Sequence, residues 1–181
     1  MVTFAQLRDC EPERFRALGG RWSRLWHKHL NGAADDLHAA YRGLAGSWEA
    51  PAYDVASDRL EALFREIDDT REPLLAMDRA LADLAEDLKH AKAALLDAVD
   101  SASRIPAVVS DDGDTITYTG EDVCADPRHR LRIQRRMEAV FDDIDAALRS
   151  AATADRACAD RLAALVPGSD PRVPQFVVTR R

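Results

Sequence analysis

Hydrophobic positions recur at alternating steps of three and four residues along most of the chain, and this spacing predicts helices. The clearest run follows Pro73 and forms one apolar seam between acidic and lysine positions: Leu74, Met77, Leu81, Leu84, Leu88, Ala91, Leu95 and Ala98. The stretch that begins at Pro51 carries a comparable stripe: Ala52, Val55, Ala56, Leu60, Leu63 and Ile67. A proline inside a helix removes a hydrogen bond and clashes with the preceding turn. We therefore expect a kink or a short break near Thr70.

A third stripe lies upstream, within residues 11–45, and it changes phase at Asn31 and Gly32. It is made of Phe15, Leu18, Trp22, Leu25 and His29 before the change, and Leu37, Ala40 and Leu44 after it. The phase change indicates either a distorted helix or a turn, because Asn and Gly tolerate the left-handed backbone that ends helices. His29 lies on the apolar stripe, which favours a hydrogen-bonded histidine in the core.

The pattern changes between residues 101 and 126, where β-branched runs flank Asp112 and Gly113. This dipeptide favours tight turns, so we expect one short β-hairpin at about residues 106–120. Helical spacing returns after Pro127 and continues until Pro167 and Gly168. The apolar face of this last helix contains Ile133, Met137, Val140, Ile144, Ala147, Ala151, Ala154, Cys158, Leu162 and Leu165.

These segments predict an all-α fold, either an elongated antiparallel helical hairpin or a three-helix bundle, with the β-hairpin as an insertion. We expect one domain over residues 1–166, followed by a linker or tail at 167–181. Leucine and alanine on the seams suit close antiparallel packing. Each stripe has more apolar surface than one neighbouring helix covers, which favours a face that binds a partner or a second copy.

Composition and charge limit the classes of function that the protein could have. Of the 181 residues, 46% are hydrophobic and 31% charged, a balance that suits soluble amphipathic helices. No apolar run is long enough for a membrane span, and charged residues appear too early for a cleavable signal peptide. The net charge of −7 disfavours binding to nucleic acid, because a polyanion is repelled on balance.

The sequence offers little for catalysis, and we predict no enzyme, cofactor or metal. Cys10, Cys124 and Cys158 are too widely spaced for a metal site, and one optional disulfide remains open. His27 and His29 are two positions apart, which sends them to different faces of a helix. The carboxylates of residues 110–115 suggest a calcium loop, but the downstream glutamate of an EF-hand is missing.

A basic cluster begins the last helix, with five arginines between Arg128 and Arg136. Positive charge is unfavourable at a helix N-terminus, so compensating acids are expected. If the helices pack antiparallel, the acids of the preceding helix can pair with these arginines: Glu86, Asp87, Asp97 and Asp100. The alternatives are a solvated face, or a site for an anion or a nucleic acid.

Two long helical segments, a corner at Trp48 and an acidic overall charge resemble the WXG family of type VII secretion substrates. The resemblance is strongest over residues 15–99 and is closest to long actinobacterial members that precede toxin regions. It implies a helical hairpin that pairs with a small WXG-like protein or with itself and is exported by a membrane ATPase. Export would take the chain from the cytoplasm to the outside without a cleavable signal peptide.

The resemblance also assigns individual residues. Trp48 matches the family's tryptophan and Ala50 takes the place of its glycine, so Pro51 and nearby Gly46 would have to help form the corner. Tyr118 and Asp122 match the spacing of the family's export signal.

The pairing face has its own candidates. Trp22 and Trp26, one turn apart, are candidate anchors for a partner. The seam residues Leu81, Leu84 and Leu88 are further candidates. The alternative is a cytosolic helical adaptor or self-associating scaffold without an export role.

Overall fold

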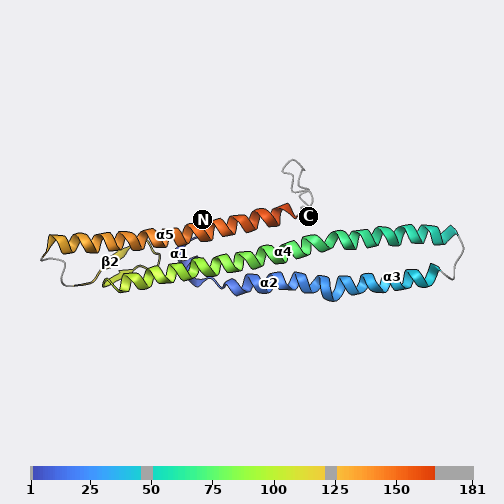
Figure 1. The fold of residues 1–181 in the computed structure, drawn as a ribbon, viewed down its shortest axis with the longest axis horizontal. Helices are drawn as coiled ribbons and strands as arrows, with labels where there is room; N and C mark the ends of the chain where they lie inside the picture. The colour runs from blue at the N-terminus through green and yellow to red at the C-terminus, as the bar shows by residue number, and fades with distance from the viewer. Residues whose placement is uncertain (1, 46–50, 121–125, 166–181) are drawn as a thin grey trace, which may run out of the picture. The chain divides into compact units, whose positions relative to one another are not determined.

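The computed structural model describes residues 2–45, 51–120 and 126–165, and it is almost entirely helical (Figure 1). The elements in order are α1 (Phe4–Asp9), α2 (Pro12–Leu25), a π-helical turn η1 (Trp26–Leu30), α3 (Asn31–Ala45), α4 (Pro51–Ser103), β1 (Ala107–Val109), β2 (Ile116–Tyr118) and α5 (Pro127–Ala164). The predicted all-α class with one short β-hairpin is confirmed. The predicted larger arrangement, an elongated hairpin or a three-helix bundle, stays a prediction, and the tail at 167–181 lies outside the described residues.

Contacts divide the chain into two compact units. Unit 1 contains Met1–Phe15 and Asp83–Ala159, and unit 2 contains Arg16–Ala82 and Asp160–Arg181. α4 contributes its second half to unit 1 and its first half to unit 2. The two units are described separately below.

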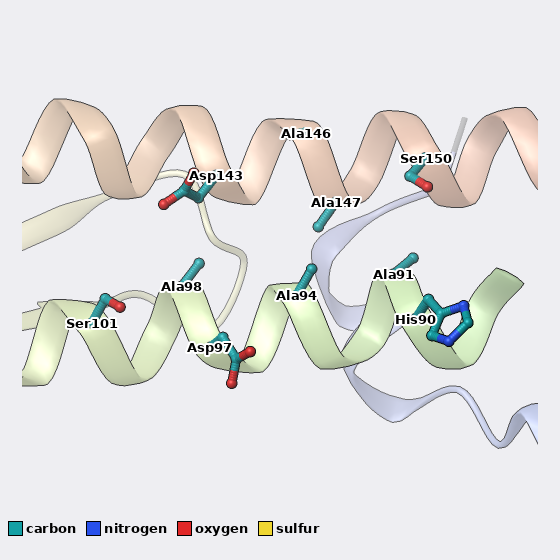
Figure 2. Close-up of a pocket in the computed structure, with 10 residues that line it drawn as sticks. All are labelled: His90, Ala91, Ala94, Asp97, Ala98, Ser101, Asp143, Ala146, Ala147 and Ser150. Carbon is teal, nitrogen blue, oxygen red and sulfur yellow. The ribbon is translucent and has the colours of Figure 1, made fainter.

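Unit 1 has a continuous core between the second half of α4 and α5. The seam residues of α4 in this unit are buried, and so are most residues of the predicted α5 face: Ile133, Val140, Ile144, Ala147, Ala151, Ala154 and Cys158. Figure 2 shows the two helices side by side, with Ala91, Ala94 and Ala98 of α4 on the side that faces α5. Small side chains at these positions allow the two backbones to approach closely.

The short helix α1 covers part of this core. Thr3 begins it with a capping box, in which the Thr3 hydroxyl accepts from the Gln6 backbone N–H and the Gln6 side chain accepts from the Thr3 N–H. Phe4 and Leu7 are buried. After the helix, the carbonyl of Cys10 accepts a hydrogen bond of 2.7 Å from the Lys92 ammonium, which joins this segment to α4.

The β-hairpin packs against α1. Its strands pair antiparallel, with Ala107 opposite Tyr118 and Val109 opposite Ile116. Residues 110–115 connect the strands, so the connection is longer than a two-residue turn. Gly113 has a φ of +77°, and its Cα lies so close to the Phe4 ring that an added Cβ would overlap the ring. A glycine is therefore required on both conformational and steric grounds.

In unit 2, the helical segment α2–η1–α3 lies along the first half of α4. The contacts between them join Gly19 to Asp78, Trp26 to Arg71, His38 to Phe64, and Tyr41 to Ser57. Residue numbers rise along one segment as they fall along the other, which is the order of two arms that run in opposite directions. For each pair, the residue number halfway between the two partners falls within or next to residues 46–50. Those residues lie outside the described residues.

The phase change at Asn31 and Gly32 is absorbed by a distorted helix. The Asn31 N–H bonds to the Trp26 carbonyl, five residues back, which defines the π-helical turn η1. Such a turn adds one residue without ending the helix. The alternative of a turn at this point is wrong. His29 is exposed, like Leu18 and Leu25 on the same predicted stripe, so the expected core histidine is not found.

Pro73 does not interrupt α4, which is a single helix from Pro51 to Ser103. The predicted short break near Thr70 is therefore absent, and a kink there stays a prediction. The Thr70 hydroxyl donates to the Glu66 carbonyl at 2.7 Å, so the side chain adds to the helical hydrogen bonding next to the proline. Leu74, directly after Pro73, is buried, and this packing favours continuation of the helix.

Candidate partner-binding surface

An aromatic seam joins the two arms of unit 2. Trp26 is the most buried aromatic residue of this seam, with 4% of its surface exposed, and the guanidinium of Arg71 lies 5.8 Å from the centre of its ring. His38 stacks on Phe64 with ring centres 3.7 Å apart. The seam thus relies on a few large contacts, because most of its other apolar side chains stay partly exposed.

Towards residues 46–50, the seam becomes more polar. The Tyr41 and Ser57 hydroxyls share a hydrogen bond of 2.6 Å, and the Tyr41 ring stacks on Tyr53. Hydrogen bonding with Tyr41, followed by partial burial, raises the pKa of Tyr53. The raised pKa keeps the Tyr53 hydroxyl protonated at neutral pH, and the hydrogen bond and the ring stack hold the two arms together here.

Beside the seam, unit 2 exposes large apolar side chains. Leu18 is 43% exposed, and Leu25 and Leu63 are each 38% exposed. Each of these residues precedes a seam residue by one position, namely Gly19, Trp26 and Phe64. In two helices that run in opposite directions, such positions lie on the same side of the pair. We call Leu18, Leu25 and Leu63 the apolar row of unit 2.

The predicted partner anchors take different positions. Trp22 is half-buried, so part of its indole is accessible. The other four are already buried by the chain itself: Trp26, Leu81, Leu84 and Leu88. A second protein has little of their surface to contact. Val55, predicted on the apolar stripe of α4, is 66% exposed, because it lies on the side of the helix away from the seam.

The structure describes the predicted corner and export signal only in part. Trp48, Ala50 and Asp122 lie outside the described residues. Pro51 is the first residue of α4, a position where its missing N–H costs nothing. Tyr118 is the last residue of β2 and is half-buried. It therefore lies in a strand, as expected.

The arginine cluster at the start of α5 lacks the expected acidic partners. Among the described residues, none of the five arginines forms an ion pair. The proposed partners have other neighbours: Glu86 lies 3.6 Å from the Lys89 ammonium, and Asp100 lies 2.6 Å from the Arg104 guanidinium. Partners three or four residues apart on one helix are neighbours on its surface, so these acids have a basic partner close by on α4 itself. The predicted pairing of Glu86 and Asp100 with the cluster is wrong.

A groove of about 510 Å³ runs between α4 and α5 in unit 1. Figure 2 shows that alanines form much of its lining, with Asp97, Asp143 and His90 along it. His90 lies 3.7 Å from the Glu86 carboxylate. Ser101 and Ser150 also line the groove, so its lining combines alanine packing surface with a few polar groups.

Two cysteines lie within the described residues. Burial raises the pKa of the half-buried Cys10 thiol, and Cys158 is buried in the core of unit 1. Within residues 2–45, 51–120 and 126–165, no group of three or more His, Cys, Asp or Glu side chains could hold a metal ion. The Asp112 carboxylate accepts from the Ser110 hydroxyl and the Asp114 N–H, so it is used to build the loop.

Several of these contacts have no clear signal in the apolar pattern. Gly19 allows α2 and α4 to touch, since an added Cβ would lie 3.0 Å from the Asp78 carbonyl oxygen. Two adjacent glycines inside a helical stripe could have indicated a close approach. The Tyr41–Ser57 bond and the His38–Phe64 stack each include a polar residue, Ser57 or His38, that hydrophobic periodicity does not detect.

Comparison with known proteins adds no further constraint. No family model, curated protein or solved structure matches this chain. Among the described residues, no helix combines the length and the apolar character that crossing a membrane requires.

Proposed function

We propose that this chain is a non-enzymatic partner-binding and targeting module of a type VII secretion system. It acts as a secreted factor or as the delivery part of a toxin. The observation that carries the proposal is the exposed apolar row beside an antiparallel pair of arms in unit 2. The resemblance of residues 15–99 to the WXG family supplies the type of partner.

The physical basis for partner binding is that unit 2 leaves part of its apolar surface exposed. Two paired helices bury one stripe each, and the apolar row of unit 2 remains open beside that stripe. A second helical hairpin placed on this side would cover Leu18, Leu25 and Leu63 and form a four-helix arrangement. Trp22 would contribute a partly exposed indole, a residue type that often dominates binding energy at interfaces.

The arms support the role assigned to Trp48. Their contacts are centred on the segment that contains this tryptophan, as the family's hairpin requires. The secretion ATPase would then recognise the paired hairpins together with an export signal, for which Tyr118 and Asp122 are the candidates.

Co-expression tests the pairing. The full chain is produced with a small WXG-like protein from the same genome and purified through a tag on the partner. We expect a stoichiometric complex, and we expect Leu18→Glu with Leu25→Glu to abolish it, because two charges would be buried without partners. Val108→Glu, an exposed position in unit 1, is the matched control and should leave the complex intact.

Export is tested separately. In a host with an active type VII system, the chain should appear in the culture medium, and Trp48→Ala or Asp122→Ala should keep it in the cells. A chain that ignores every such partner and never leaves the cytoplasm would favour the scaffold alternative. The same result would end the secretion proposal.

A further inference from the structure

A second, smaller groove lies in unit 1 between β2 and the first half of α5. It has a volume of about 280 Å³ and is lined mainly by Tyr118, Arg130, Gln134, Met137, Glu138 and Phe141. The α5 residues recur at helical steps of three and four, so they form one stripe along that helix. Tyr118, Met137 and Phe141 are half-buried. Within the described residues, Tyr118 of β2 lies against this apolar stripe of α5, and part of the stripe stays open.

Charge changes sign along this stripe of α5. Helical spacing places one arginine of the cluster, Arg130, on the stripe before Met137, and it places Glu138 and Asp145 on or beside the stripe after it. Among the described residues, Arg130 forms no ion pair. Asp145 pairs only at 3.7 Å with Arg149, and both side chains are mostly exposed. Arg130 and Asp145, at the two ends of this stripe, are therefore both accessible to another molecule.

A second copy of the chain matches this pattern. We propose that two copies associate through α5, with the two helices antiparallel about a two-fold axis near Met137. In this arrangement, Arg130 of each copy faces Asp145 of the other, and Met137 and Phe141 of both copies meet between the charged ends. The interface is self-complementary, as a two-fold interface must be.

Molecules other than a second copy of the chain fit this stripe of α5 less well. An acidic peptide or a nucleic acid would be attracted by Arg130 but repelled by Glu138 and Asp145 further along the same stripe. A parallel pair of α5 helices would bring like charges together. Only an antiparallel copy satisfies both halves, which is why the charge pattern selects it.

The size of the surface sets the expected affinity. Residues 128–145 span about 27 Å of helix, and one pair of helices of this length buries less than the roughly 1,200–2,000 Å² of a standard stable interface. The dimer should therefore be weak, form in the micromolar range and dissociate as salt is added.

A charge exchange tests the proposal on the full chain. Dimer dissociation is measured by sedimentation velocity at several protein concentrations. Arg130→Asp and Asp145→Arg should each weaken the dimer by about tenfold or more, and the double variant should recover to within about threefold, because the pair is restored with its signs exchanged. Arg132→Asp makes the same charge change on the opposite face of α5 and should have little effect.

The results separate this interface from the one proposed for unit 2. The Leu18→Glu, Leu25→Glu chain should still dimerise, since its changes lie outside α5. Circular dichroism of each variant shows whether α5 remains helical. A chain that stays monomeric, a dimer indifferent to Arg130→Asp, or single-variant losses that the double variant does not restore would each overturn the proposal.

Discussion

Unit 1 and unit 2 use the same alanine-rich and leucine-rich helical pattern but bury it to different degrees. In unit 1, α4 and α5 face each other with α1 and the β-hairpin packed around them, and most seam residues are buried. In unit 2, two arms share one seam, and the buried residues among those described are Gly19, Trp26, Leu74, Ala80 and Leu81. Within the described residues, unit 1 therefore covers its apolar stripes more completely than unit 2 does.

This comparison explains where partners should bind. A dense core such as that of unit 1 is stable without help, and only its outer stripes remain for association. A two-arm unit has a thin core, so burial against another protein adds a larger share of its stability. We therefore expect the largest mutational losses in unit 1 and the largest partner-dependent gains in unit 2.

Leu95→Ala should give the largest loss of stability. Leu95 has 0% of its surface exposed, and a buried Leu→Ala change costs about 3 to 5 kcal/mol of the free energy of unfolding. The adjacent Leu96 is 46% exposed, so Leu96→Ala should cost well under half as much. Urea denaturation followed by circular dichroism measures both. Equal losses would show that unit 1 lacks the dense core described above.

Gly19→Ala tests the close contact between the arms of unit 2. The new Cβ would lie 2.9 Å from the Asp78 side chain and 3.0 Å from its backbone oxygen, so the arms must separate, at a cost of about 1 to 3 kcal/mol. The next residue, Gly20, provides a control for which the same substitution should raise stability instead of lowering it. Gly20 has only the Arg24 side chain nearby, so Gly20→Ala should stabilise the helix by up to about 1 kcal/mol.

Removing the Tyr41–Ser57 hydrogen bond should weaken unit 2 more modestly. Ser57→Ala deletes one partner of a partly buried bond of 2.6 Å and should cost about 0.5 to 1.5 kcal/mol. Tyr41→Phe deletes the other partner, and the double variant should lose little more than either single variant. Additive losses in thermal denaturation would mean that the two hydroxyls do not stabilise each other.

The smallest effect concerns the loop of unit 1 and depends on pH. Hydrogen bonds from the Ser110 hydroxyl and then the Asp114 N–H lower the pKa of Asp112 below its ordinary value of 3.8. The carboxylate therefore adds stability above that value, and the contribution is lost as pH falls through the lower pKa of the folded state.

Asp112→Asn should accordingly lower the melting temperature slightly at neutral pH. The difference from the natural chain should disappear in strong acid, where Asp112 is protonated in both the folded and unfolded states. Asp114→Asn, in the same loop, serves as the control. A difference that persists unchanged in acid would show that the charge of Asp112 has no part in holding the loop.

Much of unit 1 could be predicted from the sequence, because its pattern is repeated and its turn residues are distinctive. The seam from Leu84 to Ala98, the face from Ile133 to Cys158 and the position of the β-hairpin all follow from spacing and from Gly113. The short break expected near Pro73 is not found, because the packing of a long helix outweighs one locally helix-breaking residue. The predicted pairing of Glu86 and Asp100 with the arginines was also wrong, because each acid has a basic side chain close by on its own helix.

The candidate surfaces were less predictable. The stripes indicated apolar faces but did not tell which side chains the chain would cover itself, so Trp26 and Leu88 were expected at an interface and are buried. Leu25 and Leu63 were placed on the same stripes, yet they remain exposed. The stripe on α5 that holds Met137 and Phe141 could be recognised as a groove only once β2 placed Tyr118 beside it.

The sequence by itself determined which segments are helical, where the β-hairpin forms and which faces are apolar, because backbone preference and side-chain period act over a few residues. The tertiary structure alone decided which apolar faces are covered and which remain open. That choice depends on contacts between residues far apart in the chain, such as Gly19 with Asp78 and Phe4 with Gly113, whose geometry no local pattern contains.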